Sequence, residues 1–374
     1  RPGCRPSHSK TSPLYQKLAQ QGAVYQDVYG WERPYWYARN DMPRAHIHAF
    51  RRSALHDVIG HEVNDLRAGA GIADLSAFSK LEIHGADVEA FLERVSSNKL
   101  PRSTGAISLT YFVNPKGRLE GEATCVRLSA NRFYLVYAAG KEAALLDWLR
   151  SQRQTGERVD FDNISETCGV LMLAGPKSRE ILARCTPVAL DNASFRWLSA
   201  RHGEVAGVAN VRMMRVTYTG ELGWELHLPM AGMPAVYEAL VAAGEGHGLV
   251  HVGAAALNAM RMEKAYKSGH ELTNEVTLAE ADLLRFARPD GFQGAGLSRA
   301  APEKWALACL RLEEPAADMP NADPLGSESI WQGGRCVGSV CSGGYGYGIG
   351  AYLIWAYVRP ACAEPGTVLQ VVTL

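Results

Sequence analysis

The segment from Tyr218 to Glu225, with the sequence Tyr-Thr-Gly-Glu-Leu-Gly-Trp-Glu, constrains this chain more than any other. It lies between two β-type runs, Val211–Val216 and Trp224–Leu228, and is therefore predicted to turn between two strands. Such a turn places a tyrosine and two carboxylates at one loop edge, where they could hold a polar ligand. The two glycines are explained by turn geometry alone, so a hairpin with solvated glutamates remains an alternative.

The length of 374 residues predicts two or three domains, because one core usually stops growing at roughly 250 to 300 residues. Helical and strand patterns are mixed without a regular βαβ alternation, which favours an α+β fold over a doubly wound parallel sheet. Short strands between glycine turns near the C-terminus indicate a small antiparallel β-barrel. We predict a tail over residues 1–10, a main α+β region of two interleaved subdomains over 11–288, a linker over 289–303 and the barrel over 304–374.

The spacing of apolar residues predicts the individual elements. A helix is predicted to start at Ser12-Pro13, and further helices at residues 86–95, 141–150, 177–185, 233–243 and 254–264. Strands are predicted at residues 80–85, 107–113, 122–128, 133–137, 306–312, 338–341, 353–358 and 368–372. The aromatic-rich stretch Gly30–Trp36 is predicted to be a loop.

Charge and hydropathy exclude several classes of partner. Lys plus Arg equals Asp plus Glu at 39 each, so no global field favours nucleic acid or an acidic membrane surface. The longest apolar run near the C-terminus, Ala351–Val358, is far shorter than the ~20 residues of a spanning helix. We therefore predict neither a nucleic-acid nor a membrane partner.

The cysteines and histidines carry no metal or nucleophile signal. The eight cysteines include no CxxC pair, and His46 and His48 lack a third ligand nearby, so no metal is predicted. Scattered free thiols indicate a reducing compartment, either the cytoplasm or, in a eukaryote, the mitochondrial matrix. The start at Arg1, without Met, is expected of a processed chain or of part of a longer polypeptide.

Several segments, in the right order from about Ser12 to the end, resemble the aminomethyltransferase family, the T-protein of glycine cleavage and its relatives. Residues 218–225 resemble the YTGExGxE signature of that family. The other matching segments are residues 71–76, 171–176, 256–264, 341–347 and 364–367. Residues 30–34, 74–80 and 342–346 look most like the folate domain of dimethylglycine and sarcosine dehydrogenases, in which a flavin domain precedes this part. This chain has no GxGxxG motif between an N-terminal strand and a helix, so it is predicted to bind no flavin itself.

The resemblance implies roles for five residues. Glu225 ends the signature and by position holds the pterin, since one carboxylate can accept a ring N–H and an exocyclic amino group together. Tyr218, Tyr111 and Arg261 are predicted to complete the site for tetrahydrofolate. Glu122 stands where the family has a catalytic aspartate, and its extra methylene moves the carboxylate by about an ångström. A surface acid at a strand edge is the alternative for Glu122.

The implied reaction is attack of the reduced folate's N5 on a reactive methylene, carried as an iminium or aminomethyl group, to give 5,10-methylenetetrahydrofolate. The substrate would be a small N-methylated amine, and the partner a flavin-dependent dehydrogenase domain or subunit. The family's arginines for the folate glutamate tail match Leu257 and Glu364, so the tail end of the site departs from the family. Two alternatives stay open: a non-catalytic folate-binding accessory protein, and a folate-dependent demethylase of a sulfonium or methoxy compound.

Overall fold

The computed structural model describes residues 10–39, 42, 44–45, 52, 54–300, 304–313 and 323–373. The predicted tail apart from Lys10, the histidines His46 and His48, and the last three residues of the predicted linker therefore lie outside the described residues.

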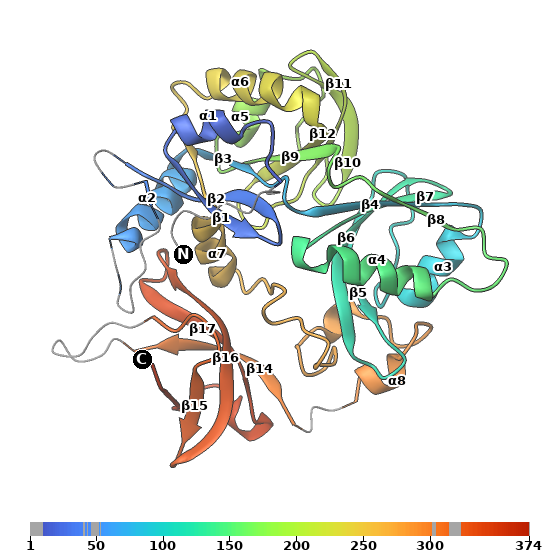
Figure 1. Ribbon diagram of the computed structural model, residues 1–374, viewed down its shortest axis with the longest axis vertical. Coiled ribbons are helices and arrows are strands. Elements are labelled where there is room, and N and C mark those ends of the chain that lie inside the picture. The colour runs from blue at the N-terminus through green and yellow to red at the C-terminus, as the bar shows by residue number, and fades with distance from the viewer. Residues whose placement is uncertain are drawn as a thin grey trace.

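Two β-sheets build the main region, and the chain passes from one to the other and back (Figure 1). The six-stranded sheet has the order β10-β11-β12-β9-β3-β13, in which only β3 and β13 run parallel. The five-stranded antiparallel sheet, β5-β6-β7-β4-β8, lies between β3 and β9 in the sequence. The strands are β3 (Ala70–Asp74), β4 (Ser79–His84), β5 (Ile107–Val113), β6 (Leu119–Ser129), β7 (Arg132–Tyr137), β8 (Asp160–Asn163), β9 (Cys168–Ala174), β10 (Ala200–Val205), β11 (Val208–Met214), β12 (Gly223–Pro229) and β13 (Leu249–His251).

Helices pack on both sheets. One face of the six-stranded sheet packs against α5 and α6, its other face packs partly against α2 and α7, and α3 and α4 pack on the five-stranded sheet. The helices are α1 (Tyr15–Gln20), α2 (Leu55–Ala68), α3 (Val88–Val95), α4 (Glu142–Ser151), α5 (Ser178–Ala183), α6 (Met233–Ala243), α7 (Ala254–Glu263) and the short α8 (Ala295–Ser298). The predicted bounds of α6, β5 and β14 (Ala306–Leu312) are confirmed residue for residue.

The two sheets also face each other directly. Val126 and Tyr134 of the five-stranded sheet share one apolar cluster with Met214 of the six-stranded sheet. We call the space between the two sheets, which this cluster fills in part, the inter-sheet layer. Side chains alternate between the two faces of a strand, so residues in register with these three point into the same layer. The candidate site lies along this layer.

The C-terminal strands form an antiparallel sheet, but it is open where a barrel was predicted. The order is β14-β17-β16-β15-β18, and the two-residue β18 pairs with β15 and not with β14, so the described strands do not close. The remaining strands of this sheet are β15 (Ser329–Gln332), β16 (Arg335–Gly346), β17 (Ala351–Val358) and β18 (Gln370–Val371). The α+β architecture with a small C-terminal antiparallel unit is confirmed.

The prediction of a loop at Gly30–Trp36 is wrong. These residues form most of β2 (Trp31–Tyr37), which pairs antiparallel with β1 (Ala23–Val28). Trp31 and Trp36 are buried, and aromatic side chains fit a pleated, half-buried surface well. The hairpin packs beside α7 and α2.

Glu62 joins three of these elements from a fully buried position on α2. Its Oε1 accepts the backbone N–H of Tyr37 at 2.7 Å, and its Oε2 accepts that of Gly253, the residue before α7, at 2.7 Å. Burial raises the pKa of Glu62 to about 7, although both N–H groups act in the opposite direction. The folded protein therefore holds this proton more tightly than the unfolded chain does.

This proton predicts a specific pH dependence of stability. The contribution of Glu62 is fully present below its unfolded pKa of about 4.5 and is lost as pH rises through its folded pKa of about 7. The difference in unfolding free energy between wild type and Glu62→Gln, which cannot ionise, should change by about 2 to 3 kcal/mol between pH 5 and pH 8. Urea unfolding at several pH values measures it, and a constant difference would contradict the prediction.

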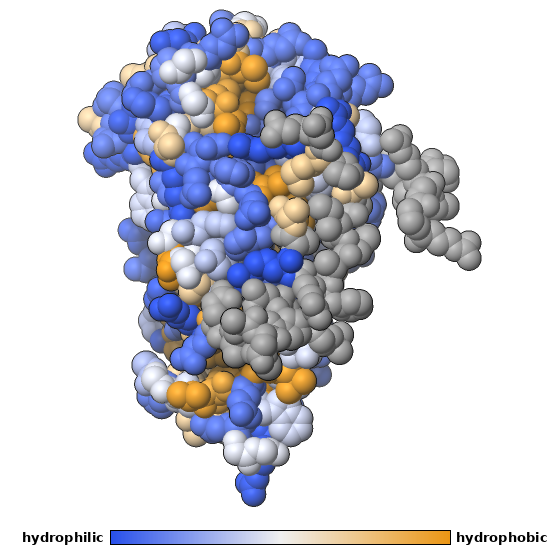
Figure 2. Space-filling view, turned by 90° about the vertical axis from the view of Figure 1, so that its left-hand side faces the viewer, coloured by the Kyte–Doolittle hydropathy of each residue, from blue (hydrophilic) through white to orange (hydrophobic). Residues whose placement is uncertain are grey.

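The outer surface is mainly hydrophilic on the face shown in Figure 2, where apolar residues gather in small patches, one of them at the lower end. Exposed large apolar side chains of the C-terminal unit include Leu325, Val368 and Val372. In the part of the chain that the structure describes, no helix is both long enough and apolar enough to cross a membrane.

Candidate active site

Glu122 lies near the start of β6, directly opposite Tyr111 on β5, and the two side chains share one face of the sheet. That face is the one that carries Val126 and Tyr134, so both residues point into the inter-sheet layer. Within the described residues, the Glu122 carboxyl has no hydrogen bond or ion pair with the protein. The side chain of Glu122 is partly buried, and its strand β6 lies inside the sheet between β5 and β7.

The electrostatics of Glu122 suit proton transfer near neutral pH. Burial, followed by the negative charge of Glu271, raises the pKa of Glu122 to about 8, although Arg261 and Lys267 act in the opposite direction. The carboxyl is therefore mostly protonated at pH 7. Burial and then the charge of Glu122 also raise the pKa of Tyr111.

Glu225 enters the same layer from the opposite sheet. On β12 it is in register with Met214 of β11, the residue that packs against Tyr134. Its side chain is 15 % exposed, and its Oε2 lies 3.2 Å from Nε2 of the fully buried His227. Oε1 has no hydrogen-bond partner in the described part of the chain, so one oxygen of a largely buried carboxylate is left for a ligand.

Tyr218 connects the signature loop to the segment that follows α7. Its hydroxyl donates to the backbone oxygen of Lys267 at 2.7 Å, and its ring stacks on Tyr266 with centroids 6.0 Å apart. Burial raises its pKa first, Arg261 opposes that shift, and Glu122 and Glu271 add to it. Tyr218 and Glu122 are therefore close enough for the charge of Glu122 to act on the Tyr218 hydroxyl.

Arg261 was predicted to contact the cofactor, but the structure gives its guanidinium a different use. Nε donates to Asn258, the two Nη groups donate to Glu271, Tyr266 O and Ser342, and the side chain is 1 % exposed. These bonds account for all five N–H donors of an arginine. The guanidinium is thus engaged by protein groups in this structure, and its charge also acts on Glu122.

Two residues near Glu122 were not predicted. Glu271 is fully buried and accepts from Arg261, from the Ser268 backbone and hydroxyl, and from the Ser342 hydroxyl. Lys267 contacts Asp282, and its ammonium lies 5.2 Å from the Trp355 ring. The resemblance gave no role to either residue.

The other signature carboxylate has a structural partner. Glu221 pairs with Arg67 of α2 at 3.5 Å, and Arg67 in turn binds Glu263 at the end of α7 at 2.9 Å. The first glutamate of the signature therefore connects the loop to the helices, and the second is the one that enters the inter-sheet layer.

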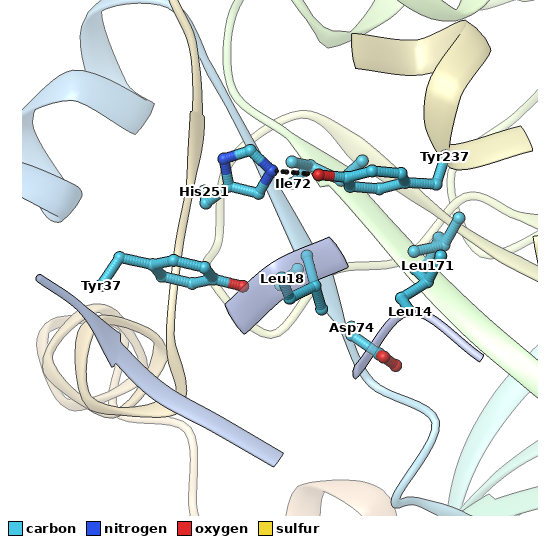
Figure 3. Close-up of a pocket in the computed structure, with 9 residues that line it drawn as sticks. Leu14, Leu18, Tyr37, Ile72, Asp74, Leu171, Tyr237 and His251 are labelled. Carbon is cyan, nitrogen blue, oxygen red and sulfur yellow. Dashed lines mark hydrogen bonds between the residues drawn. The ribbon is translucent and has the colours of Figure 1, made fainter. Parts of the chain in front are cut away.

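Two hollows elsewhere contain none of the predicted site residues. One is a small pocket beside α1 with essentially no room even for a water molecule (Figure 3). There His251 Nε2 lies 2.8 Å from the Tyr237 hydroxyl, and burial lowers the pKa of His251 to about 4. Most of its lining residues belong to the main apolar core, so it is a packing defect and too small for a pteridine. A hollow of about 520 Å³ is lined by Glu89, Glu93, Lys99, Leu100, Arg102, Arg127 and Arg288.

The fold places the chain in a known structural class. It superimposes on the aminomethyltransferase T of the glycine cleavage system from Bartonella henselae with a TM-score of 0.80 and 22 % identity, covering 97 % of this chain and 93 % of the other. A model of the GCVT N-terminal domain matches residues 14–290, and one of the glycine cleavage T-protein C-terminal barrel domain matches residues 306–374. The chain therefore belongs to the glycine cleavage T-protein family, as its motifs predicted.

Curated relatives that are similar to the chain include a dehydrogenase and a transferase. It is 32 % identical to human mitochondrial dimethylglycine dehydrogenase over 97 % of this chain and 42 % of that protein. It is 29 % identical to the aminomethyltransferase of Saccharopolyspora erythraea over 98 % of this chain and 94 % of that enzyme. The chain thus spans less than half the length of the dehydrogenase and nearly all of the transferase.

Proposed function

We propose that this chain binds tetrahydrofolate between its two main sheets and uses it to accept a one-carbon unit from a small N-methylated amine. The observation that carries the proposal is that Glu122 and Glu225 point from facing sheets into the same layer, each with at least one carboxyl oxygen that no described protein group occupies. The similarity to dimethylglycine dehydrogenase supports an amine substrate delivered by a flavin-dependent dehydrogenase domain or subunit.

The residues present fit a reduced pterin. Its ring N–H and exocyclic amino group are adjacent donors, and a half-paired carboxylate such as Glu225 offers the matching acceptors. Tyr111, in register with Glu122, and Tyr218, on which the charge of Glu122 acts, would supply aromatic surface. When bound, tetrahydrofolate would supply the nucleophilic amine that takes up an electrophilic methylene.

The protein would contribute orientation, exclusion of water and one proton relay. Glu122 carries a proton at neutral pH and can donate it to the amine nitrogen of the substrate as that amine departs. The carboxylate left behind is close to Arg261 and Lys267, whose charges stabilise it until it accepts a proton again. Each turnover thus returns Glu122 to its starting state.

Loss of the Glu225 carboxylate tests the binding part of this proposal. Glu225→Ala is expected to weaken tetrahydrofolate binding by about 10- to 100-fold, because a pair of charge-assisted hydrogen bonds is removed. Isothermal titration with tetrahydrofolate measures the dissociation constant, and Glu204→Ala, at an exposed glutamate of β10, is the matched control. Equal affinity of both variants would remove Glu225 from the site, and binding without any turnover by wild type would favour an accessory role.

A further inference from the structure

His227 occupies the position two residues after Glu225 on β12, so both side chains lie on the same face of the strand. This polar residue is fully buried, between Leu226 and Leu228 of the strand. A buried imidazole needs partners for both ring nitrogens. Its two partners are Glu225 on one side and Tyr134 on the other.

The geometry defines a chain of hydrogen bonds that crosses from one sheet to the other. The Tyr134 hydroxyl lies 2.9 Å from Nδ1 of His227, and Nε2 lies 3.2 Å from Oε2 of Glu225. Tyr134 is itself held in place, because the Arg212 guanidinium lies 4.0 Å from its ring centroid and pairs with Glu82 at 3.0 Å. The Cys168 sulfur also lies 4.0 Å from the Tyr134 hydroxyl.

The partners determine which nitrogen of His227 carries the proton. An ionised Glu225 only accepts, so Nε2 must be the N–H donor, and in a neutral imidazole Nδ1 is then an acceptor. The Tyr134 hydroxyl, which can donate, satisfies that acceptor. Burial lowers the pKa of His227, against the effect of Glu225, so the ring is neutral at pH 7.

We propose that His227, fixed by Tyr134, is a positioning residue that holds Oε2 of Glu225 and directs Oε1 toward the pterin. This inference rests on the proposed function. Without this bond, the Glu225 side chain would be free to rotate away from the inter-sheet layer. The bond therefore lowers the entropic cost of binding the ligand and should act on affinity more than on the chemical step. Nothing in this role requires His227 to touch the ligand.

Substitutions at two positions test the proposal. His227→Phe keeps the ring volume and removes the donor, and it is expected to raise the dissociation constant of tetrahydrofolate about 10-fold while turnover at saturation stays within about threefold. His227→Gln places an amide N–H near the position of Nε2 and should restore affinity to within about threefold of wild type. Tyr134→Phe, which removes one hydroxyl only, should weaken binding by about two- to fivefold and serves if His227→Phe does not fold.

His84→Gln is the matched control, because His84 Nε2 makes a similar contact with Asp162, 2.9 Å away, at the surface. Far-UV circular dichroism establishes that each variant is folded. Wild-type affinity in folded His227→Phe and Tyr134→Phe would overturn the positioning role, and so would a His227→Gln variant as weak as His227→Phe. If wild type itself bound no tetrahydrofolate, the proposed function would fail first, so the two failures are distinguishable.

Discussion

Replacing Glu122 by glutamine is expected to lower turnover by about 10²- to 10⁴-fold, the usual contribution of a general acid–base group, while tetrahydrofolate affinity stays within about threefold. Glutamine keeps the shape of the side chain but cannot carry a transferable proton. Because Glu122 has no hydrogen bond to the protein in the described structure, its loss should leave the fold intact. The variant therefore separates chemistry from binding and from stability.

The measurement is formation of methylenetetrahydrofolate from an N-methylated amine, with the dehydrogenase partner or a chemically generated iminium as the source of the methylene. Glu204→Gln, at an exposed position of β10, controls for loss of a strand carboxylate and should keep turnover within about twofold of wild type. Unchanged turnover in Glu122→Gln would show that the proton comes from elsewhere and would favour a role limited to folate binding.

The sequence was most informative where one short segment contained both a turn signal and a candidate ligand-binding carboxylate. The signature from Tyr218 to Glu225 is short and lies between clear strands, so its turn could be predicted from the pattern, and the family resemblance implied which carboxylate faces the ligand. The same reasoning could have found His227. A polar residue at the i+2 position of a buried strand face has to have a partner nearby, and Glu225 was already known to share that face.

Other features of the structure could not be predicted because they depend on contacts distant in sequence. Arg261 was assigned to the cofactor because its helix resembled a family motif, but the donors of a guanidinium can be assigned only when Glu271 and Ser342, from a loop and another sheet, are in place. Helix α2 was missed partly because the buried Glu62 interrupts its apolar face. The two carboxyl oxygens of Glu62 accept hydrogen bonds from backbone N–H groups of β2 and of the residue before α7. No local sequence pattern reveals these contacts.

Replacing Arg261 by methionine is expected to destabilise the protein by about 3 to 5 kcal/mol, because Glu271 would be left as a fully buried charge without its cation. The pair also joins α7 to the C-terminal sheet through the Ser342 hydroxyl on β16. Loss of Arg261 should therefore weaken the connection between the main region and that sheet. Urea unfolding followed by tryptophan fluorescence measures the change.

The double variant Arg261→Met/Glu271→Leu distinguishes an unpaired charge from lost packing. Removing both charges should recover most of the stability, since a buried ion pair is often replaceable by apolar side chains of similar volume. Lys177→Met, which breaks a solvent-exposed pair with Glu180, should cost less than about 1 kcal/mol and is the control. A double variant as unstable as Arg261→Met would mean that the hydrogen bonds to Asn258, Tyr266 and Ser342, and not the uncompensated charge of Glu271, make Arg261 indispensable.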